Sequence, residues 1–183
     1  PADLQGKRLP DEPDDPASWI VEPVSCCVTA MDTSPLRAGD TVAVIGCGFM
    51  GQVILQLLDH SFAAEVHAFD VIQDRLELAD ELNRVVTHPI TGEKGADKWS
   101  DAFDIVYDTT GAQEGLDLAV GMTRAAGHVN LFGWLKGTEA RFDPSAWHLK
   151  GITICNSSPA GQLRDPFPAA IRLMARDRVR LRP

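Results

Sequence analysis

The stretch Val44–Gln52, which reads VIGCGFMGQ, places three glycines in the spacing G-x-G-x-x-G. A short apolar run, Thr41–Ile45, leads into it, and Met50–Leu58 follows with apolar residues at helical spacing. Glycine is needed where the backbone turns sharply or where two elements approach closely. The stretch therefore predicts a β-strand, a tight turn and an α-helix in immediate succession.

The same alternation of short apolar runs with amphipathic runs continues along the chain. Parallel strands need helical crossovers between them, and such crossovers are right-handed almost without exception. We therefore expect an α/β fold with a doubly wound, parallel, six-stranded sheet and helices on both faces. The predicted strands are 41–45, 65–69, 84–88, 105–107, 128–132 and 152–155, and the predicted helices after the first strand are 50–58, 73–83, 113–125 and 166–176.

The beginning of the chain differs in composition from the rest. Residues 1–15 are polar, with Pro10, Pro13 and four acids between Asp11 and Asp15, so they are expected to form a linker or the remnant of a preceding domain. Residues 16–183 are expected to form one domain. Its leading helices are predicted to start at Asp15-Pro16 and at Glu22-Pro23. The predicted apolar face of this region comprises Trp19, Ile20, Val24, Cys27, Val28 and Met31.

Composition and charge restrict the class of function. The formal net charge of −9 argues against a nucleic-acid partner, and no apolar run approaches the ~20 residues of a membrane span. The arginines between Arg164 and Arg182 are read as a helix C-terminus followed by a solvated tail. The four cysteines lack a C-x-x-C pair, and no signal-peptide pattern opens the chain, so we expect a cytoplasmic protein. The five histidines are expected on the surface or at strand ends.

The context of the three glycines favours a dinucleotide site over an ordinary turn. Gly46 permits the tight turn, Gly48 lets the backbone approach a pyrophosphate, and Gly51 lets the helix pack closely on the strand. The first amides of the helix then face the phosphates. The intervening residues Cys47, Phe49 and Met50 are included in the predicted site. The alternative is a purely structural turn.

An acid after the second strand indicates which dinucleotide binds. Asp70 lies nineteen residues past Gly51, where a ribose-binding carboxylate is expected. Such a carboxylate favours NAD, because the 2′-phosphate of NADP would meet a like charge. Arg75 is placed near the adenine. The alternatives are that Asp70 caps a helix and that Arg75 is simply solvated.

Two further loops follow strands that end at the same edge of the predicted sheet. Thr110 and Gly111 follow the fourth strand, and Phe132 and Gly133 follow the fifth. Open α/β sheets bind ligands at the carboxyl ends of their strands, so these residues are predicted to receive the nicotinamide half. The alternative is that Thr110-Gly111 merely begins a helix.

Taken in order, several short motifs resemble the medium-chain dehydrogenase/reductase superfamily, in its zinc-dependent alcohol and polyol dehydrogenase branch. The resemblance covers roughly residues 8–183. It implies a Rossmann domain that binds NAD and belongs to an oxidoreductase. The motifs are Leu9-Pro10-Asp11-Glu12, Val21-Glu22-Pro23-Val24, Arg37-Ala38-Gly39-Asp40, VIGCGFMGQ, Phe69-Asp70, Thr110-Gly111, Ala126-Gly127-His128-Val129 and Lys150-Gly151-Ile152-Thr153-Ile154.

The resemblance also implies a catalytic zinc in the complete enzyme, with Glu22 as a candidate ligand and Cys26 near the nicotinamide. The alternatives are that Glu22 is simply an acid in the first turn of a helix and that Cys26 is a buried core cysteine. The family's amino-terminal catalytic domain, with the remaining zinc ligands, has no counterpart before Leu9. The chain alone is therefore expected to bind NAD and to have essentially no turnover.

The implied reaction moves a hydride between a small alcohol or polyol and NAD. Two other functions remain open: a non-catalytic dinucleotide-binding regulatory module, and a zinc-free reductase of the same superfamily. The last predicted strand, 152–155, is placed at the sheet edge. Because exposed edges invite pairing, a homo-oligomer formed through that strand is expected.

Overall fold

The computed structural model describes residues 20–90, 97–135, 139–157 and 163–181. They form a parallel six-stranded sheet in the order β3-β2-β1-β4-β5-β6, which confirms the predicted fold class. The chain starts at the centre of the sheet, moves out to β3 and returns beside β1 at β4. The strands are β1 (Thr41–Ile45), β2 (Glu65–Asp70), β3 (Val85–Pro89), β4 (Phe103–Asp108), β5 (Thr123–Leu131) and β6 (Thr153–Asn156).

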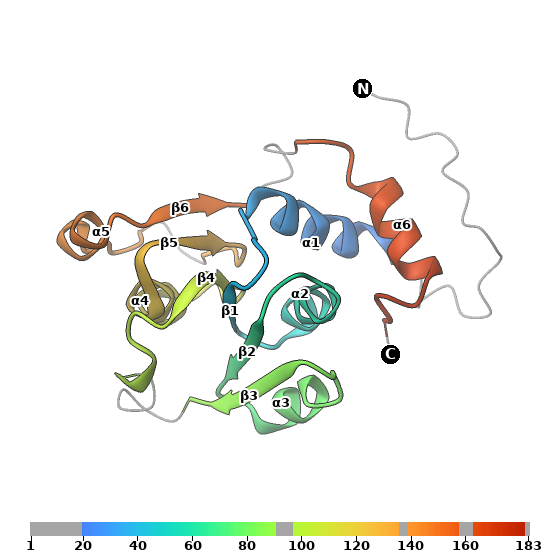
Figure 1. Ribbon diagram of the computed structural model, residues 1–183, viewed down its shortest axis with the longest axis horizontal. Helices are drawn as coiled ribbons and strands as arrows, with labels where there is room; N and C mark the ends of the chain where they lie inside the picture. The colour runs from blue at the N-terminus through green and yellow to red at the C-terminus, as the bar shows by residue number, and fades with distance from the viewer. Residues whose placement is uncertain (1–19, 91–96, 136–138, 158–162, 182–183) are drawn as a thin grey trace.

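Helices cover both faces of the sheet. In Figure 1, α1, α2, α3 and α6 lie on one side, and α4 and α5 lie on the other. None of the helices within the described ranges has the length and apolar character needed to cross a membrane. The helices are α1 (Val21–Thr33), α2 (Phe49–Asp59), α3 (Gln73–Ala79), α4 (Gln113–Met122), α5 (Pro144–Lys150) and α6 (Phe167–Ala175), with a short 3-10 helix, η3 (Asp97–Trp99).

The strand register brings the predicted binding loops to one edge. Ile45, the last residue of β1, is the partner of Phe69 in β2 and of Asp108 in β4. Leu131, at the end of β5, is also paired with Asp108. The loops after β1, β2, β4 and β5 therefore leave the sheet at the same level. The point where the sheet order reverses, between β1 and β4, lies in the middle of this edge.

Two predicted helices are shorter than expected. Residues 73–83 were predicted to be helical, but α3 ends at Ala79, and Leu78 near its end is 44% exposed. The prediction of helix to residue 125 was also wrong, because β5 begins at Thr123. The end of α4 is fixed from outside: the Lys150 ammonium donates to the carbonyl oxygens of Val120, Gly121 and Thr123, at 2.9 to 3.0 Å.

The helix α5 was not predicted, although the sequence carries its boundaries. Asp143 accepts hydrogen bonds from the amides of Ser145 and Ala146, and Pro144 occupies the first turn. Gly151 ends the helix with a left-handed backbone, φ 59°. At seven residues, the helix is too short for its apolar spacing to stand out in the sequence.

The helix α1 buries most of its predicted apolar face. Val24, Cys27 and Val28 are almost fully buried, and the Cys27 thiol donates to the Met50 carbonyl in the first turn of α2 at 3.7 Å. Ile20, at 49% exposed, is the exception, and it lies one residue before the helix. Trp19, the helix start predicted at Asp15-Pro16 and the predicted linker 1–15 lie outside the described residues.

The segment that follows α6 is docked and not a solvated tail, so that prediction was wrong. Val179 is 2% exposed and joins the core around α1 and α2. The Gln56 side chain of α2 accepts from the Arg180 amide at 2.7 Å and donates to its carbonyl at 3.3 Å. The apolar Val179 and Leu181 alternate with Arg178 and Arg180, and both apolar side chains join the core beside α1 and α2.

Two histidines lie within the sheet, contrary to the expectation of surface or strand-end positions. His67 is 7% exposed and His128 is 7% exposed. His67 and His88 stack side by side on a face of the sheet that η3 covers, together with Phe69, Trp99 and Phe103. These aromatic rings supply the cover that a helix supplies elsewhere on the sheet.

A hydrogen-bonded chain links Glu65, His67 and His88. The His67 Nε2 atom faces the Glu65 carboxylate at 3.2 Å, and a carboxylate only accepts, so Nε2 donates. The Nδ1 atom of His67 lies 2.8 Å from His88 Nε2, and a hydrogen bond joins the two rings. Burial, the neighbouring His67 and Lys98 lower the pKa of His88 from 6.5 to about 4. The folded protein therefore keeps His88 neutral.

This neutral histidine predicts a loss of stability in mild acid. Since the folded pKa lies below the unfolded pKa, the contribution is complete above about pH 6.5 and is lost as the pH falls towards 4. Between pH 6.5 and 4.5, the free energy of unfolding should fall by on the order of 1 kcal/mol more in the wild type than in His88→Phe. Urea titrations at several pH values measure this difference. His148→Phe, on exposed α5, is the matched control, and equal pH profiles for wild type and His88→Phe would contradict the assignment.

Candidate functional site

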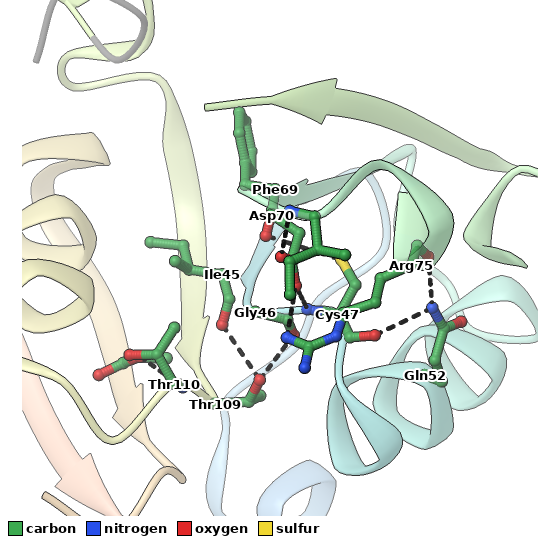
Figure 2. Close-up of polar contacts among 11 residues, drawn as sticks. Ile45, Gly46, Cys47, Gln52, Phe69, Asp70, Arg75, Thr109 and Thr110 are labelled. Carbon is green, nitrogen blue, oxygen red and sulfur yellow. Dashed lines mark hydrogen bonds and ion pairs between the residues drawn. The ribbon is translucent and has the colours of Figure 1, made fainter. Parts of the chain in front are cut away.

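The loop between β1 and α2 is held from both neighbouring strands (Figure 2). From the β2 side, the Phe69 carbonyl accepts from the Gly46 amide at 2.8 Å. From the β4 side, the Thr109 hydroxyl donates to the Gly46 carbonyl at 2.6 Å and approaches that of Ile45 at 3.1 Å. Gly46 has φ +90°, a conformation that L side chains rarely adopt. The tight turn predicted for Gly46 is therefore present.

The other two glycines of the motif differ in what surrounds them. A Cβ atom on Gly51 would overlap the Gly46 carbonyl oxygen, so the absence of a side chain lets α2 start directly above the loop. A Cβ atom on Gly48 would meet nothing within 4 Å. Gly48 caps α2 without any side-chain hydrogen bond to the helix start. The first amides of the helix thus lack intrahelical partners and border open space, as an anion site requires.

Asp70 is a structural part of this loop as well as a candidate ligand. Its carboxylate accepts from the Cys47 amide at 2.6 Å and from the Ile72 amide at 2.8 Å, and the residue is 5% exposed. Asp70 is not the cap of α3, because the N-cap residue of that helix is Ile72. A carboxylate offers about four acceptor positions, so two amides leave capacity for a ribose.

The other predicted residues of the loop are placed by the same contacts. Cys47 is buried, its amide is bonded to Asp70 and its thiol donates to the Phe69 carbonyl at 3.6 Å. Burial, with the adjacent Asp70 charge, raises the pKa of the Cys47 thiol to about 12. Phe49, half exposed, and Met50, partly buried, form the first turn of α2. Cys47 can therefore shape the loop, but its own donors are engaged.

Arg75 lies beside Asp70. One of its terminal nitrogens is 3.6 Å from the Asp70 carboxylate, and its side chain is 47% exposed. The Gln52 side chain of α2 donates to the Cys47 carbonyl at 3.1 Å and to the Arg75 carbonyl at 2.7 Å. A hollow of about 490 Å³ opens from Gly48 and Arg75 along α2. The hollow extends away from the point between β1 and β4 where the strand order reverses. It therefore borders the β1–α2 loop and is not the centre of the candidate site.

On the other half of the edge, the loops after β4 and β5 pack against each other. The carbonyl of Asp108 accepts from the amides of Phe132 and Gly133, at 2.9 and 2.8 Å. Gly111 has φ +65°, and a Cβ atom on it would overlap the Trp134 carbonyl. A Cβ atom on Gly133 would in turn overlap the Gly111 amide. The two predicted nicotinamide loops thus form one surface through their glycines.

The Asp108 side chain holds the Thr110 end of this surface in place. One carboxylate oxygen accepts from the amide and the hydroxyl of Thr110, at 2.9 and 2.7 Å. The residue is fully buried, and its second oxygen has no partner among the described residues. Burial raises the pKa of the Asp108 carboxyl, while the two bonds from Thr110 oppose that shift. Thr110 is therefore oriented by Asp108, and its hydroxyl also accepts from the Ala112 amide at 3.1 Å.

Glu22 lies in the exposed first turn of α1. The Cys26 thiol, one turn further along α1, donates to the Glu22 carboxylate at 3.1 Å. Burial, reinforced by this hydrogen bond and by the Glu22 charge, raises the pKa of Cys26 to about 11. Cys26 is therefore a protonated thiol at neutral pH. Within the described ranges, no group of three or more histidine, cysteine or acidic side chains could hold a metal ion. Glu22 alone does not make a zinc site.

Sequence reasoning missed two contributors to this edge. Thr109 locks the glycine loop to β4, and Gln52 joins the loop to α3. The signal for Gln52 was a polar residue inside the apolar stripe of α2, and Thr109 gave no signal because its role depends on strand order. Several large apolar side chains are also exposed at this edge: Val71 (74%), Ile72 (41%) and Trp134 (87%). Apolar surface left exposed beside polar groups commonly marks a binding site.

Comparison with known proteins agrees with this geometry. A family model described as a zinc-binding dehydrogenase matches residues 50–176. The (R,R)-butanediol dehydrogenase of Bacillus subtilis (strain 168) is 29% identical over 174 residues, which cover 91% of this chain and 48% of that protein. The crystal structure of L-idonate 5-dehydrogenase from Escherichia coli superposes with a TM-score of 0.80 at 21% identity, covering 94% of this chain and 49% of that one.

A structure of a protein from Sinorhizobium meliloti 1021, solved with NADP bound, has a TM-score of 0.73 at 24% identity and covers 88% of this chain and 48% of that chain. At these identities the two solved structures establish the fold. The chain spans about half the length of the relatives that it matches.

The contrast between Gly48 and Gly51 gives a matched pair of substitutions. Gly51→Ala should lower the free energy of unfolding by about 1–3 kcal/mol or more, because its methyl group overlaps a backbone carbonyl. Gly48→Ala should leave it unchanged within about 0.5 kcal/mol, because its methyl group enters open space. Denaturant unfolding of the two variants measures the difference. Equal stability of the two variants would show that the loop is not packed as described.

Proposed function

Because this chain belongs to the zinc-binding dehydrogenase family, in the zinc-dependent alcohol and polyol branch of the medium-chain dehydrogenase/reductase superfamily, we propose that it is the cofactor-binding part of an oxidoreductase. The whole enzyme transfers a hydride between a small alcohol or polyol and NAD. One observation carries this proposal: the uncapped start of α2 borders open space at Gly48, directly beside the Asp70 carboxylate.

The adenosine half of NAD lies over β2 in this proposal. The pyrophosphate is received by the first amides of α2, above Gly46, Gly48 and Gly51, where the positive end of the helix dipole attracts it. The free acceptor capacity of Asp70 holds the ribose hydroxyls. Arg75, at 3.6 Å from Asp70, is close enough to contact the same sugar and the adenine attached to it. The exposed Val71 and Ile72 offer an apolar surface to the base.

The nicotinamide half lies over β4 and β5. Thr110, Gly111, Phe132 and Gly133 supply backbone groups and small side chains there, and the contacts of Asp108 hold both loops in place. When bound, a nicotinamide supplies a ring carbon that accepts or gives up a hydride. The task of this chain is to fix the orientation of the ring and to keep it at the edge of the sheet, because hydride transfer requires close alignment of donor and acceptor.

A zinc ion belongs to the proposal only for the whole protein. Glu22 is a candidate ligand, but the described residues do not complete a metal site. The proposed domain division is a linker or remnant of the preceding domain at residues 1–15 and a cofactor domain at 16–183. A cytoplasmic location is proposed as well. The isolated chain should bind NAD without turning over an alcohol.

The butanediol dehydrogenase relative favours a diol or similar small alcohol as the substrate. The non-catalytic module and the zinc-free reductase are retained as alternatives. Assays of the full-length protein with vicinal diols, together with measurement of bound zinc, separate the three functions. Turnover with stoichiometric zinc supports the proposal, turnover without zinc supports the reductase, and NAD binding without turnover supports the module.

The edge strand β6 supports the proposal of a homo-oligomer. The strand pairs only with β5 among the described elements, so its other edge is open for a second copy. Thr153 and Asn156 are exposed there. Because proline has no amide hydrogen to donate to a pairing strand, Thr153→Pro should shift the protein to monomers in sedimentation equilibrium. Unchanged mass, with the fold intact by circular dichroism, would rule out pairing through β6.

Calorimetry with NADH and ADP-ribose tests the cofactor site itself. Both ligands should bind, because both carry the pyrophosphate and the adenosine ribose, and NADH should bind more tightly because it also reaches the β4 and β5 loops. Absence of heat with either ligand would overturn the proposed function. Equal affinities for the two would overturn only the placement of the nicotinamide half.

Asp70 predicts a preference for NADH over NADPH of at least about tenfold, since a buried carboxylate repels a 2′-phosphate. Asp70→Asn should weaken NADH binding by about tenfold, which corresponds to the loss of one charged hydrogen bond. It should also reduce the preference for NADH over NADPH. Asp74→Asn, an exposed acid on α3, carries the same charge change and should alter neither value. Tighter binding of NADPH than of NADH by the wild type would contradict the assignment.

A further inference from the structure

A hollow of about 850 Å³ lies beside α6, the helix that packs on α1 in Figure 1. Arginines near a helix C-terminus are favoured by the helix dipole, but the dipole does not explain why side chains from before the helix and from α2 line the same hollow. We refer to this site as the arginine hollow. Its lining residues are His60, Arg164, Ala169, Arg172, Leu173, Arg176 and Arg178.

Two guanidinium groups of the arginine hollow lack a carboxylate partner. Arg172 and Arg176 are exposed, and no acid within the described ranges forms a salt bridge with either of them. Asp177, the next residue, lies 3.5 Å from a different arginine. Arg164, by contrast, makes a two-pronged ion pair with Asp32 of α1, both distances being 2.7 Å. The hollow thus keeps spare positive charge in a chain with 26 acidic and 17 basic residues.

The polar side chains that line the hollow are all hydrogen-bond donors. The side chain of arginine has no acceptor, so Arg178 donates to the Nδ1 atom of His60 at 3.2 Å. The Nε2 atom of a neutral His60 ring therefore carries the hydrogen and is a further donor. No acidic side chain is among the described residues of the lining. A site with several donors and no acceptor group is suited to an anion.

We propose that the arginine hollow binds a compact anion that carries two or more phosphate groups. A guanidinium group pairs with phosphate oxygens through two parallel hydrogen bonds, which a carboxylate-free lining leaves available. Arg172 and Arg176 are four residues apart on one face of α6, with their Cβ atoms about 6 Å apart, so both can reach one small ligand. An extended polyanion would also meet the acidic remainder of the chain, whose net charge is −9.

This site is distinct from the proposed cofactor site. His60 and Arg178 also line the smaller hollow that opens at Gly48 and Arg75, so the two hollows adjoin. Gly48 and His60, however, lie at opposite ends of α2, whose eleven residues span about 16 Å. One pyrophosphate cannot bridge that length. A phosphorylated ligand in the arginine hollow and NAD at the β1–α2 loop can therefore be bound at the same time.

Calorimetry with inorganic pyrophosphate tests the arginine hollow, with saturating ADP-ribose present to keep the probe away from the β1–α2 loop. The wild type should bind pyrophosphate, and Arg172→Gln/Arg176→Gln should weaken binding at least about tenfold, because charge-assisted hydrogen bonds are lost. Arg37→Gln/Arg141→Gln removes the same charge from exposed positions outside the hollow and should bind as the wild type does. Absence of binding by the wild type, or equal weakening in both variants, would overturn the proposal.

The same experiment keeps the two sites apart. If ADP-ribose itself gives no heat, the proposed function fails, while the response of pyrophosphate to the Arg172 and Arg176 substitutions still decides the arginine hollow. Phosphate groups also occur on nucleic acids and lipid surfaces. A short DNA duplex or phosphatidylglycerol vesicles that bound the wild type more tightly than pyrophosphate does would overturn the assignment of a compact ligand.

Chemical modification of the wild type locates the bound anion without any substitution. Phenylglyoxal modifies exposed guanidinium groups, and mass spectrometry measures the extent of reaction at each arginine. Pyrophosphate should slow the modification of Arg172 and Arg176 at least threefold and leave that of Arg37 and Arg141 unchanged. Protection that is equal at all four arginines, or absent at Arg172 and Arg176, would exclude the site.

Discussion

The hydrogen bond between the Cys47 amide and the Asp70 carboxylate, 2.6 Å long and buried, is the contact on which the candidate site depends. It ties the loop after β1 to the end of β2, so the helix start and the carboxylate cannot move independently. Because the donor is a backbone amide, almost any residue at position 47 could supply it. The acceptor has to be an acid or an amide of the same length. This explains how a single side chain can shape the loop and still offer oxygen atoms to a ligand.

The rest of the edge repeats this arrangement on the opposite side of the switch point. Asp108 ends β4 as Asp70 ends β2, and it too uses its carboxylate to hold backbone amides in the loop that follows. Its carbonyl fixes the β5 loop as well. The two acids differ in surroundings: Asp70 has Arg75 nearby, whereas one oxygen of Asp108 has no partner among the described residues. The first half thus suits a polar sugar and the second a flat, less polar ring.

The sequence predicted the sheet and the glycine loop because their signals are local. A strand, three spaced glycines and an amphipathic helix follow one another within twenty residues, and β1 was placed at its observed bounds. The wrong predictions concern segments whose structure depends on contacts with residues far away in the sequence. The Lys150 ammonium ends α4 from across the chain, and Gln56 holds the segment after α6 in place. Thr109 likewise gains its role only when β4 is laid beside β1. The burial of His67 could not be read from its own strand, since η3 supplies the cover.

The Gln52 amide group has a mechanical consequence. Its two donated bonds end on the Cys47 carbonyl and the Arg75 carbonyl, so one rigid planar group spans the turn and the neighbouring helix. A displacement of the turn by even a few tenths of an ångström must strain one of these bonds or carry α3 along. A phosphate that shifted the turn on binding would therefore also shift the Arg75 backbone. The turn and α3 would then move together towards a bound adenosine.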